Sequence, residues 1–181
     1  VATSVALQKE TDDAKEIIEF IEKNPISFMN GQKGQEVLMG SENVTEVIRT
    51  NEVTNTVSKI SAMTEIREFM VAEQQRIAKN GGIIMDGRDI GTVVLPKADL
   101  KIFLVASVDE RAERRYKENL SKGIPTDLER LKIEISERDR KDSTRAISPL
   151  KQAEDAILLD STGKTINEIV QFIEDKAKEL M

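Results

Sequence analysis

Apolar residues recur every three to four positions in several stretches of this chain, which is the spacing of one face of an α-helix. In residues 12–23 three isoleucines share such a face, with Asp12 and Asp13 at the start and Pro25 just beyond the end. Acidic residues favour a helix N-terminus and proline cannot continue a helix, so we expect a helix there. The same spacing predicts helices over residues 51–63 and 65–79.

Further helix starts are indicated by a Ser or Thr followed three positions later by Glu, the spacing of a capping box. In such a box the hydroxyl and the carboxylate bind backbone N–H groups of the first helical turn. The second of these helices should continue to about residue 140, and the last should turn Ile166 inward together with three later apolar residues. The pairs are Ser107 and Glu110, Thr126 and Glu129, and Thr165 and Glu168.

Short apolar runs between the helices predict strands of a buried sheet. They cover residues 82–85, 101–106 and 156–159. Because strands alternate with helices, we expect an α/β fold with a parallel sheet. Residues 26–29 and 36–39 predict two more short strands, and the Asn30-Gly31 pair between them is a strong hairpin signal. This part of the chain therefore predicts a small antiparallel β insert.

Charged residues and glycines follow the first apolar run, in the segment Met85-Asp86-Gly87-Arg88-Asp89-Ile90-Gly91-Thr92. Ligands of open α/β sheets bind at the carboxyl ends of the strands, so this position favours a polar ligand site. Asp and Gly also favour turns, and an ordinary turn at the end of a strand explains the same residues. Both interpretations are open on this segment alone.

The composition excludes several kinds of chemistry. The 181 residues include no Cys and no His, which excludes disulfides, thiol nucleophiles, Cys or His metal sites and acid–base catalysis by His. A net charge of −6 and an aromatic content of 3% argue against a nucleic-acid partner. No apolar run approaches the roughly 20 residues of a membrane span, and no signal-peptide pattern occurs. We expect no membrane partner and a cytoplasmic location.

Positive charge is concentrated in two short clusters. Arg138, Asp142 and Arg145 have the i, i+4, i+7 spacing of one helix face, where two guanidinium groups could grip a phosphate and the carboxylate could accept sugar hydroxyls. The alternative is a solvated charged face, and it applies equally to the second cluster, Arg111, Arg114 and Arg115. Without His or Cys, phosphoryl transfer is the reaction that fits best, because it depends on positioning and electrostatics.

Gly163-Lys164-Thr165 has the ending of a phosphate-binding P-loop, but the glycine required five positions before Gly163 is replaced by Leu158. The helix cap at Thr165 is the better explanation of these residues.

Several segments together resemble bacterial cytidylate kinases. The resemblance covers essentially the whole chain, and it is carried by specific motifs. They are Asp86 to Val94 followed by Lys101 to Leu104, Ile48 to Val53 with Ser58 and Arg67 behind it, Arg138 to Arg145 followed by Ser148 to Leu150, and Leu159 to Thr162.

The resemblance implies a P-loop NTPase-like parallel sheet flanked by helices, a monophosphate-binding β insert at residues 25–50 and a helical lid at residues 109–140. It implies transfer of the γ-phosphoryl group of ATP to CMP or dCMP, with Mg²⁺ as cofactor, in a monomeric enzyme.

By position, the resemblance implies that Ser58, Arg67 and Asp89 face the cytosine. A carboxylate can accept a hydrogen bond from the exocyclic amino group of cytosine. Uracil has a carbonyl at that position, which would repel the carboxylate. The remaining roles also follow from the resemblance. Arg88 and Arg138 would lie near the transferred or acceptor phosphate, Asp142 and Arg145 would bind the ribose and base side, Asp86 would help to organise Mg²⁺ through water, and Arg111, Arg114 and Arg115 would open the lid that covers ATP.

The family's N-terminal P-loop is the one missing feature, since the pattern Gly-x-x-x-x-Gly-Lys-Ser/Thr does not occur in these 181 residues. We therefore expect a single kinase domain that is incomplete at its N-terminus and inactive by itself. The alternative is a non-catalytic nucleotide-binding module that has no P-loop at all.

Overall fold

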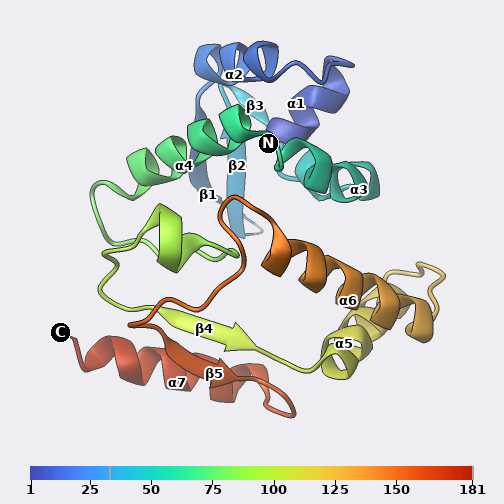
Figure 1. The fold of residues 1–181 in the computed structure, drawn as a ribbon, viewed down its shortest axis with the longest axis vertical. Helices are drawn as coiled ribbons and strands as arrows, with labels where there is room; N and C mark the ends of the chain where they lie inside the picture. The colour runs from blue at the N-terminus through green and yellow to red at the C-terminus, as the bar shows by residue number, and fades with distance from the viewer. Residues whose placement is uncertain (33, 181) are drawn as a thin grey trace. The chain divides into compact units, whose positions relative to one another are not determined.

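The computed structural model describes residues 1–32 and 34–180. The chain forms two compact units, Val1–Ile84 and Met85–Met181, shown as a ribbon in Figure 1. Both contain helices and a small sheet, so the α/β class expected from the alternating apolar runs is confirmed. The parallel sheet lies in the second unit and the antiparallel sheet in the first.

The helices of the first unit pack around an aliphatic core. The side chains of Val5 and Ile17 are fully buried, and Ile21, Ile60 and Ile66 join them. The predicted helix after Asp13 is confirmed, because the Asp13 carboxylate accepts hydrogen bonds from the first backbone N–H groups. The helices are α1 (Ala2–Gln8), α2 (Ala14–Lys23), the 3-10 helix η1 (Val47–Arg49), α3 (Asn51–Ile60) and α4 (Thr64–Ala78).

The two predicted antiparallel strands are also confirmed. Strands β1 (Ile26–Gly31) and β2 (Gly34–Met39) are antiparallel, and their register pairs Ile26 with Met39 and Gly31 with Gly34. A third short strand, β3 (Glu42–Asn43), pairs with β2. Lys33 belongs to the predicted turn but lies outside the described residues.

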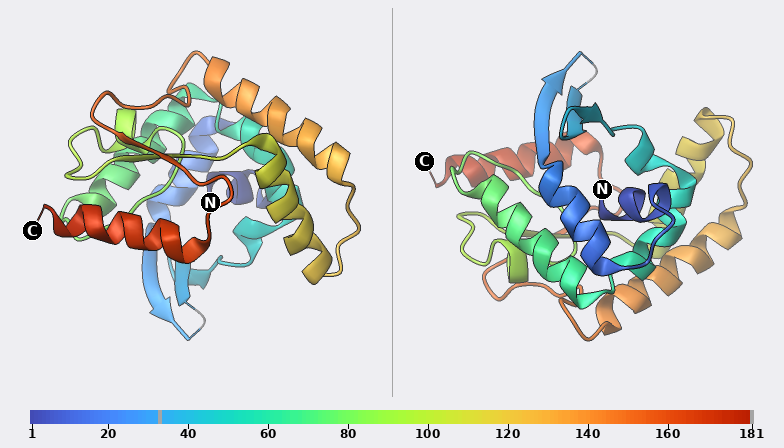
Figure 2. Two further views of the ribbon diagram at one scale, coloured as in Figure 1. Left: turned by 90° about the horizontal axis from the view of Figure 1, so that it is seen from below. Right: turned by 90° about the horizontal axis from the view of Figure 1, so that it is seen from above.

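The second unit is built on two parallel strands. Strand β4 (Ile102–Val105) pairs with β5 (Ile157–Asp160), and the register joins Ile102 to Ile157 and Val105 to Asp160. Figures 1 and 2 show α5 and α6 side by side beyond the carboxyl end of β4. The other elements are the π-helical turn η2 (Ile90–Val94), α5 (Val108–Ser121), α6 (Leu128–Thr144) and α7 (Ile166–Lys178).

The predicted strand at residues 82–85 is wrong. This segment is irregular, and the Ile84 side chain is 95% exposed. A strand forms only where a neighbour accepts its backbone hydrogen bonds, and none of the strands described in this structure runs beside residues 82–85. The preceding helix ends as expected, with Gly81 and Gly82 in the left-handed conformation that glycine adopts readily.

The helix caps agree with the sequence only in part. Thr165 and Glu168 form the complete reciprocal capping box at the start of α7. Helix α6 is capped by Asp127 and not by Thr126: the Asp127 carboxylate accepts from the Arg130 N–H at 2.7 Å, and the Thr126 hydroxyl accepts from the Asn119 side chain at 3.2 Å. Ile166 is 81% exposed, so the expectation that it turns inward is wrong. Helix α6 also continues past residue 140 to Thr144.

The Ser107 box is half formed. The Ser107 hydroxyl accepts from the Glu110 N–H at 3.1 Å, but the Glu110 carboxylate accepts from the Arg114 Nε at 2.8 Å instead of returning to the cap. No helix among the described residues is long and apolar enough to cross a membrane.

Candidate functional site

Asp142, on the last turns of α6, lies among three guanidinium groups. The Nε of Arg88 donates to Asp142 Oδ2, while Arg138 Nε and Arg145 Nη1 lie 3.9 Å from the carboxylate oxygens. The Asp142 side chain is only 16% exposed, so these charges interact with little screening by water. We call Arg88, Arg138, Asp142 and Arg145 the Asp142 cluster. The structure thus brings together four of the predicted site residues.

The backbone after α6 explains how Arg145 reaches this position. The helix ends at Thr144, and Arg145 itself is extended, so the three residues do not share one helix face as the spacing suggested. The chain then folds back, because the Leu150 N–H donates to the Asp142 carbonyl at 2.8 Å. The Arg145 Nε donates to the Ser148 carbonyl at 2.5 Å, and Ser148 adopts a positive φ of 49°. The loop therefore returns Arg145 to the end of the helix.

The Asp142 cluster carries more positive than negative charge. Partial burial, together with the neighbouring charge of Arg88, lowers the pKa of Arg138, and the Asp142 carboxylate offsets only part of this effect. Guanidinium groups crowded around a single carboxylate are stabilised by a further anion. A phosphate is the natural ligand for such a group, since it accepts bidentate hydrogen bonds from Arg.

The segment singled out from the sequence contains a π-helical turn and no strand. The Asp89 carbonyl accepts from the N–H groups of Val93 and Val94 at 2.9 and 3.2 Å, which closes the turn. Asp89 is buried, with 9% of its surface exposed, whereas Asp86 at the start of the segment is exposed. Arg88 pairs with Asp142, whereas the adjacent Asp89 is buried, so these two neighbouring charged residues have different surroundings.

The arginines assigned to the lid are held by protein groups. Both terminal nitrogens of Arg111 donate to the two carboxylate oxygens of Asp139, at 2.9 and 2.5 Å. Arg114 donates to Glu110 and to the backbone carbonyl of Ser161, which joins the start of α5 to the end of β5. The side chain of Arg115 is exposed. The predicted contact of these three residues with ATP stays a prediction.

The other predicted base-contacting residues lie in the first unit. Ser58 is exposed on α3. Arg67 is half-buried on α4, where its backbone N–H donates to the Met63 carbonyl. Their predicted approach to cytosine together with Asp89 stays a prediction.

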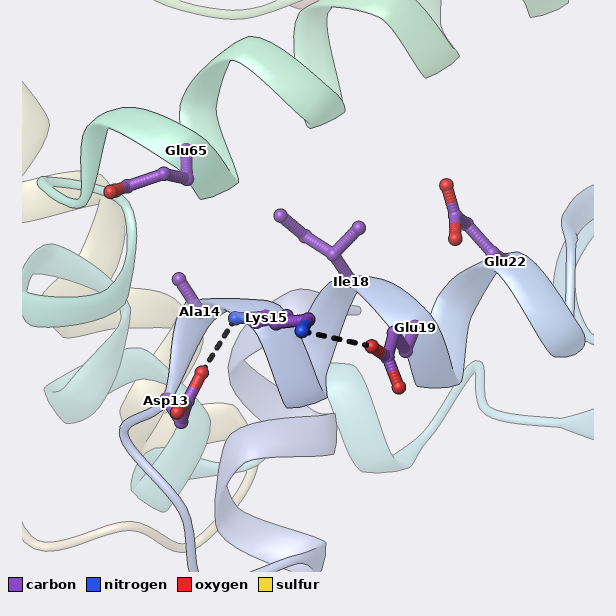
Figure 3. Close-up of a pocket in the computed structure, with 7 residues that line it drawn as sticks. All are labelled: Asp13, Ala14, Lys15, Ile18, Glu19, Glu22 and Glu65. Atoms are coloured by element: carbon purple, nitrogen blue, oxygen red, sulfur yellow. Dashed lines mark hydrogen bonds and ion pairs between the residues drawn. The ribbon is translucent and has the colours of Figure 1, made fainter.

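A shallow groove between α2 and α4 is a separate feature of the first unit. Figure 3 shows its lining, with Ile18 between the helices and Lys15 turned toward Glu19. The other lining residues are Asp13, Ala14, Glu22 and Glu65. None of the predicted site residues lines it, and its acidic side chains do not suit a phosphate.

Two residues of the second unit, Asp139 and Lys101, were not identified from the sequence as site residues. Asp139 was noted only as part of a motif, although it holds Arg111. Lys101 is buried beside the π-helical turn, and the signal for it was present, since a lysine opens an otherwise apolar strand segment. A charged residue at such a position normally requires a partner.

Comparison with known proteins gives the family of the chain. The family model for cytidylate kinase matches residues 1–179. A cytidylate kinase from Lactococcus lactis subsp. lactis (strain IL1403) is 99% identical over the whole chain, which spans 82% of that relative. The cytidylate kinase of Lactococcus lactis subsp. cremoris (strain MG1363) is 84% identical over the same shares. That of Streptococcus sanguinis (strain SK36) is 58% identical over 99% of this chain and 81% of the relative. The chain therefore belongs to the cytidylate kinase family.

Proposed function

We propose that these residues belong to an enzyme that transfers the γ-phosphoryl group of ATP to CMP or dCMP, giving ADP and CDP or dCDP. The observation that carries this proposal is the Asp142 cluster, in a chain whose relatives at 84–99% identity are named cytidylate kinases. A non-catalytic nucleotide-binding module is not favoured, because those relatives match the chain over its whole length.

Arg88 and Arg138 act on the phosphates in this proposal. Charge develops on the phosphoryl oxygens during transfer, and guanidinium groups positioned beforehand stabilise it. The phosphate of the incoming acceptor neutralises part of the arginine charge that the Asp142 carboxylate otherwise neutralises. Asp142 and Arg145 then turn to the ribose and base side of the acceptor, where the carboxylate accepts hydrogen bonds from sugar hydroxyls.

Cytosine is recognised by Asp89 together with Ser58 and Arg67. The burial of Asp89 supports this role, since a shielded carboxylate strengthens a hydrogen bond from the amino group of cytosine and rejects the carbonyl of uracil more strongly. Arg111, Arg114 and Arg115 belong to the lid over ATP. The bonds that hold Arg111 and Arg114 in place fit a role in fixing the base of α5.

Mg²⁺ with ATP is the cofactor of this proposal. The ion usually keeps several waters and takes one or two carboxylates together with substrate phosphates. Asp86, exposed just before Arg88, would help to hold the ion through its bound water. No cluster of three or more acidic residues suited to a metal occurs in the described part of the chain. Bound Mg²⁺ would neutralise charge on the transferred group.

No P-loop motif occurs in residues 1–181, so we propose that these residues bind the acceptor without cradling the phosphates of ATP. Residues 1–181 expressed alone should then bind CMP in calorimetry but transfer no phosphate. We further propose that the enzyme is a cytoplasmic monomer acting on free nucleotides, which light scattering coupled to size exclusion can test for the oligomeric state.

The enzyme's acceptor preference tests the proposed function. ADP release is measured with CMP, dCMP, UMP and AMP at equal concentration. We expect both cytidine nucleotides to react much faster than UMP and AMP. Equal rates for all four would overturn the proposal, and binding of CMP without turnover in the enzyme would support the non-catalytic alternative.

A further inference from the structure

Lys101 directly precedes strand β4 and is buried, with 7% of its side chain exposed. The Nζ donates to the Pro96 carbonyl at 2.5 Å and to the two carboxylate oxygens of Asp155 at 2.9 and 2.7 Å. An ammonium group has three N–H donors, and these acceptors use all of them. Lys101 is thus fully engaged by the protein and is not available to a substrate.

The contacts of Lys101 are made to the loop that carries the proposed base-reading residue. Its aliphatic stem lies under Gly91, where an added Cβ would meet the Lys101 Cδ at 3.4 Å. Its Nζ holds Pro96, just beyond the π-helical turn Ile90–Val94. Gly91, near the start of the turn, and Pro96, just beyond its end, therefore both lie against one side chain.

The start of the same turn is Asp89. The Asp89 carbonyl accepts from Val93 and Val94, so the position of the carboxylate follows the position of the turn. Arg88 precedes it directly and pairs with Asp142. A displacement of the turn away from β4 would move both residues.

Asp155 supplies the counter-charge from the loop before β5. Its side chain is 64% exposed, and the hydrogen bond from Lys101 lowers its pKa. The Lys101 carbonyl also accepts from the Ile157 N–H at 2.9 Å, which fixes the backbone of Lys101 to the next strand. The Lys101 backbone is therefore held by Ile157 and its ammonium group by Asp155, while the aliphatic part of the side chain packs against Gly91 of the turn.

We propose that Lys101, held by Asp155, is a positioning residue that sets the place of Asp89 and Arg88 and so determines selectivity for cytosine. The inference rests on the proposed function, because it assigns a consequence to the base reading by Asp89. Neither Lys101 nor Asp155 touches substrate in this proposal, and both act through Gly91 and Pro96.

Lys101→Met and Asp155→Asn test the proposal in the enzyme. Loss of the ammonium should raise the KM for CMP and lower the preference for CMP over UMP, each about tenfold, since small displacements of positioning groups cost this much or more. The KM for ATP should stay within about twofold. Asp155→Asn should change the same quantities in the same direction by about threefold, because the Pro96 acceptor remains.

Two matched variants separate positioning from general stability. Asp155→Glu keeps the carboxylate on an exposed side chain and should retain the acceptor preference. Lys176→Met removes an ammonium that binds two carboxylate oxygens of Glu179 on α7, at 2.7 and 2.9 Å, and should leave the CMP to UMP ratio unchanged.

A readout independent of turnover follows from the geometry. The backbone amide signals of Gly91 and Val93 in NMR spectra should shift in Asp155→Asn but not in Lys176→Met. If Lys101→Met does not fold, Asp155→Asn decides the question.

A lower melting temperature with unchanged KM for CMP and unchanged selectivity would overturn the positioning role. If the unaltered enzyme does not prefer CMP over UMP, the proposed function itself fails, and this outcome is visible before any variant is compared.

Discussion

Arg88 and Asp142 lie 54 positions apart in the chain, and the Nε of Arg88 donates to Asp142 Oδ2. The pair joins the segment after residue 85 to the last turns of α6. Arg138 and Arg145 approach the same carboxylate, so removal of Asp142 would leave three guanidinium groups without their shared acid. In the proposed reaction the acceptor phosphate enters this excess of positive charge.

Asp142→Asn should therefore weaken acceptor binding. The amide keeps the size of the side chain but not its charge, so Arg88 and Arg145 lose the group that orients them. We expect kcat/KM for CMP to fall about tenfold or more, since unpairing a largely desolvated charge costs well over 1 kcal/mol. Steady-state kinetics with CMP varied at saturating ATP measure this change.

Glu134→Gln is the control for Asp142→Asn. Glu134 lies on the same helix and pairs with Arg130 at 2.9 Å, but both side chains are largely exposed. Exposed pairs of this kind contribute little, so kcat/KM should stay within about twofold. Equal losses in the two variants would show that charge on α6 matters only in a general way.

Asp89→Ala should reduce discrimination between bases more than it reduces ATP binding. Without the carboxylate, cytosine loses an acceptor for its amino group and uracil is no longer repelled. We expect the CMP to UMP ratio of kcat/KM to fall about tenfold to a hundredfold, the range of one strong polar contact. Competition assays with both acceptors give the ratio directly.

Asp99→Ala provides the comparison for Asp89→Ala. Asp99 is an exposed carboxylate of the connection that leads to β4, and its removal should not change the ratio. An unaltered acceptor preference in Asp89→Ala would contradict the base-reading role, whatever happens to the overall rate.

Local signals predicted much of this fold. Asp13 and Pro25 bound helix α2 almost as expected, and the Asn30-Gly31 pair lies at the predicted hairpin of β1 and β2. These signals act over a few residues, so the sequence displays them directly. The strand expected at residues 82–85 failed because strand formation also depends on a neighbour, which a short apolar run does not reveal.

The candidate site shows the same division. The spacing of Arg138 and Asp142 suggested a common helix face, and the structure places both near one another. The sequence spacing could not show that Arg88 is the closest partner of Asp142, or that Asp139 forms an ion pair with Arg111. Pairs between side chains tens of residues apart depend on how the chain packs. Lys101 was visible as a charge beside an apolar strand, but its partners were not.

Thr165→Ala should destabilise the protein without changing its chemistry. The Thr165 hydroxyl accepts from the Glu168 N–H, and the Glu168 carboxylate accepts from the Thr165 N–H at 2.7 Å. Loss of such a cap should lower the free energy of unfolding by about 1 kcal/mol, with kcat/KM for CMP unchanged. Urea unfolding followed by circular dichroism measures the difference.

Ser121→Ala is the matched control for the cap. The Ser121 hydroxyl donates to the Glu118 carbonyl at 2.7 Å in the last turn of α5 and caps no helix start. Its removal should change the free energy of unfolding by less than about 0.5 kcal/mol. If Thr165→Ala is no worse than this control, the capping box adds no stability.

Acid should weaken the link between α5 and α6 through Asp139. The hydrogen bonds from Arg111 lower the pKa of Asp139, and the charges of Arg88 and Arg138 act in the same direction. A carboxylate whose pKa is lower in the folded than in the unfolded state stabilises the fold fully above its unfolded pKa of about 4. This stabilisation is lost as the pH falls from about 4 through the folded pKa.

Asp139→Asn should therefore flatten the acid limb of the pH–stability curve. The pair is about one-third exposed on each side, so its contribution at neutral pH should be about 1 kcal/mol or less and should shrink in high salt. Asp175→Asn on α7 is the control, because Asp175 takes part only in exposed contacts with Gln171 and Lys178 among those described. Parallel acid limbs for Asp139→Asn and the unaltered protein, with the difference between them constant from pH 3 to 7, would contradict a titrating role for Asp139.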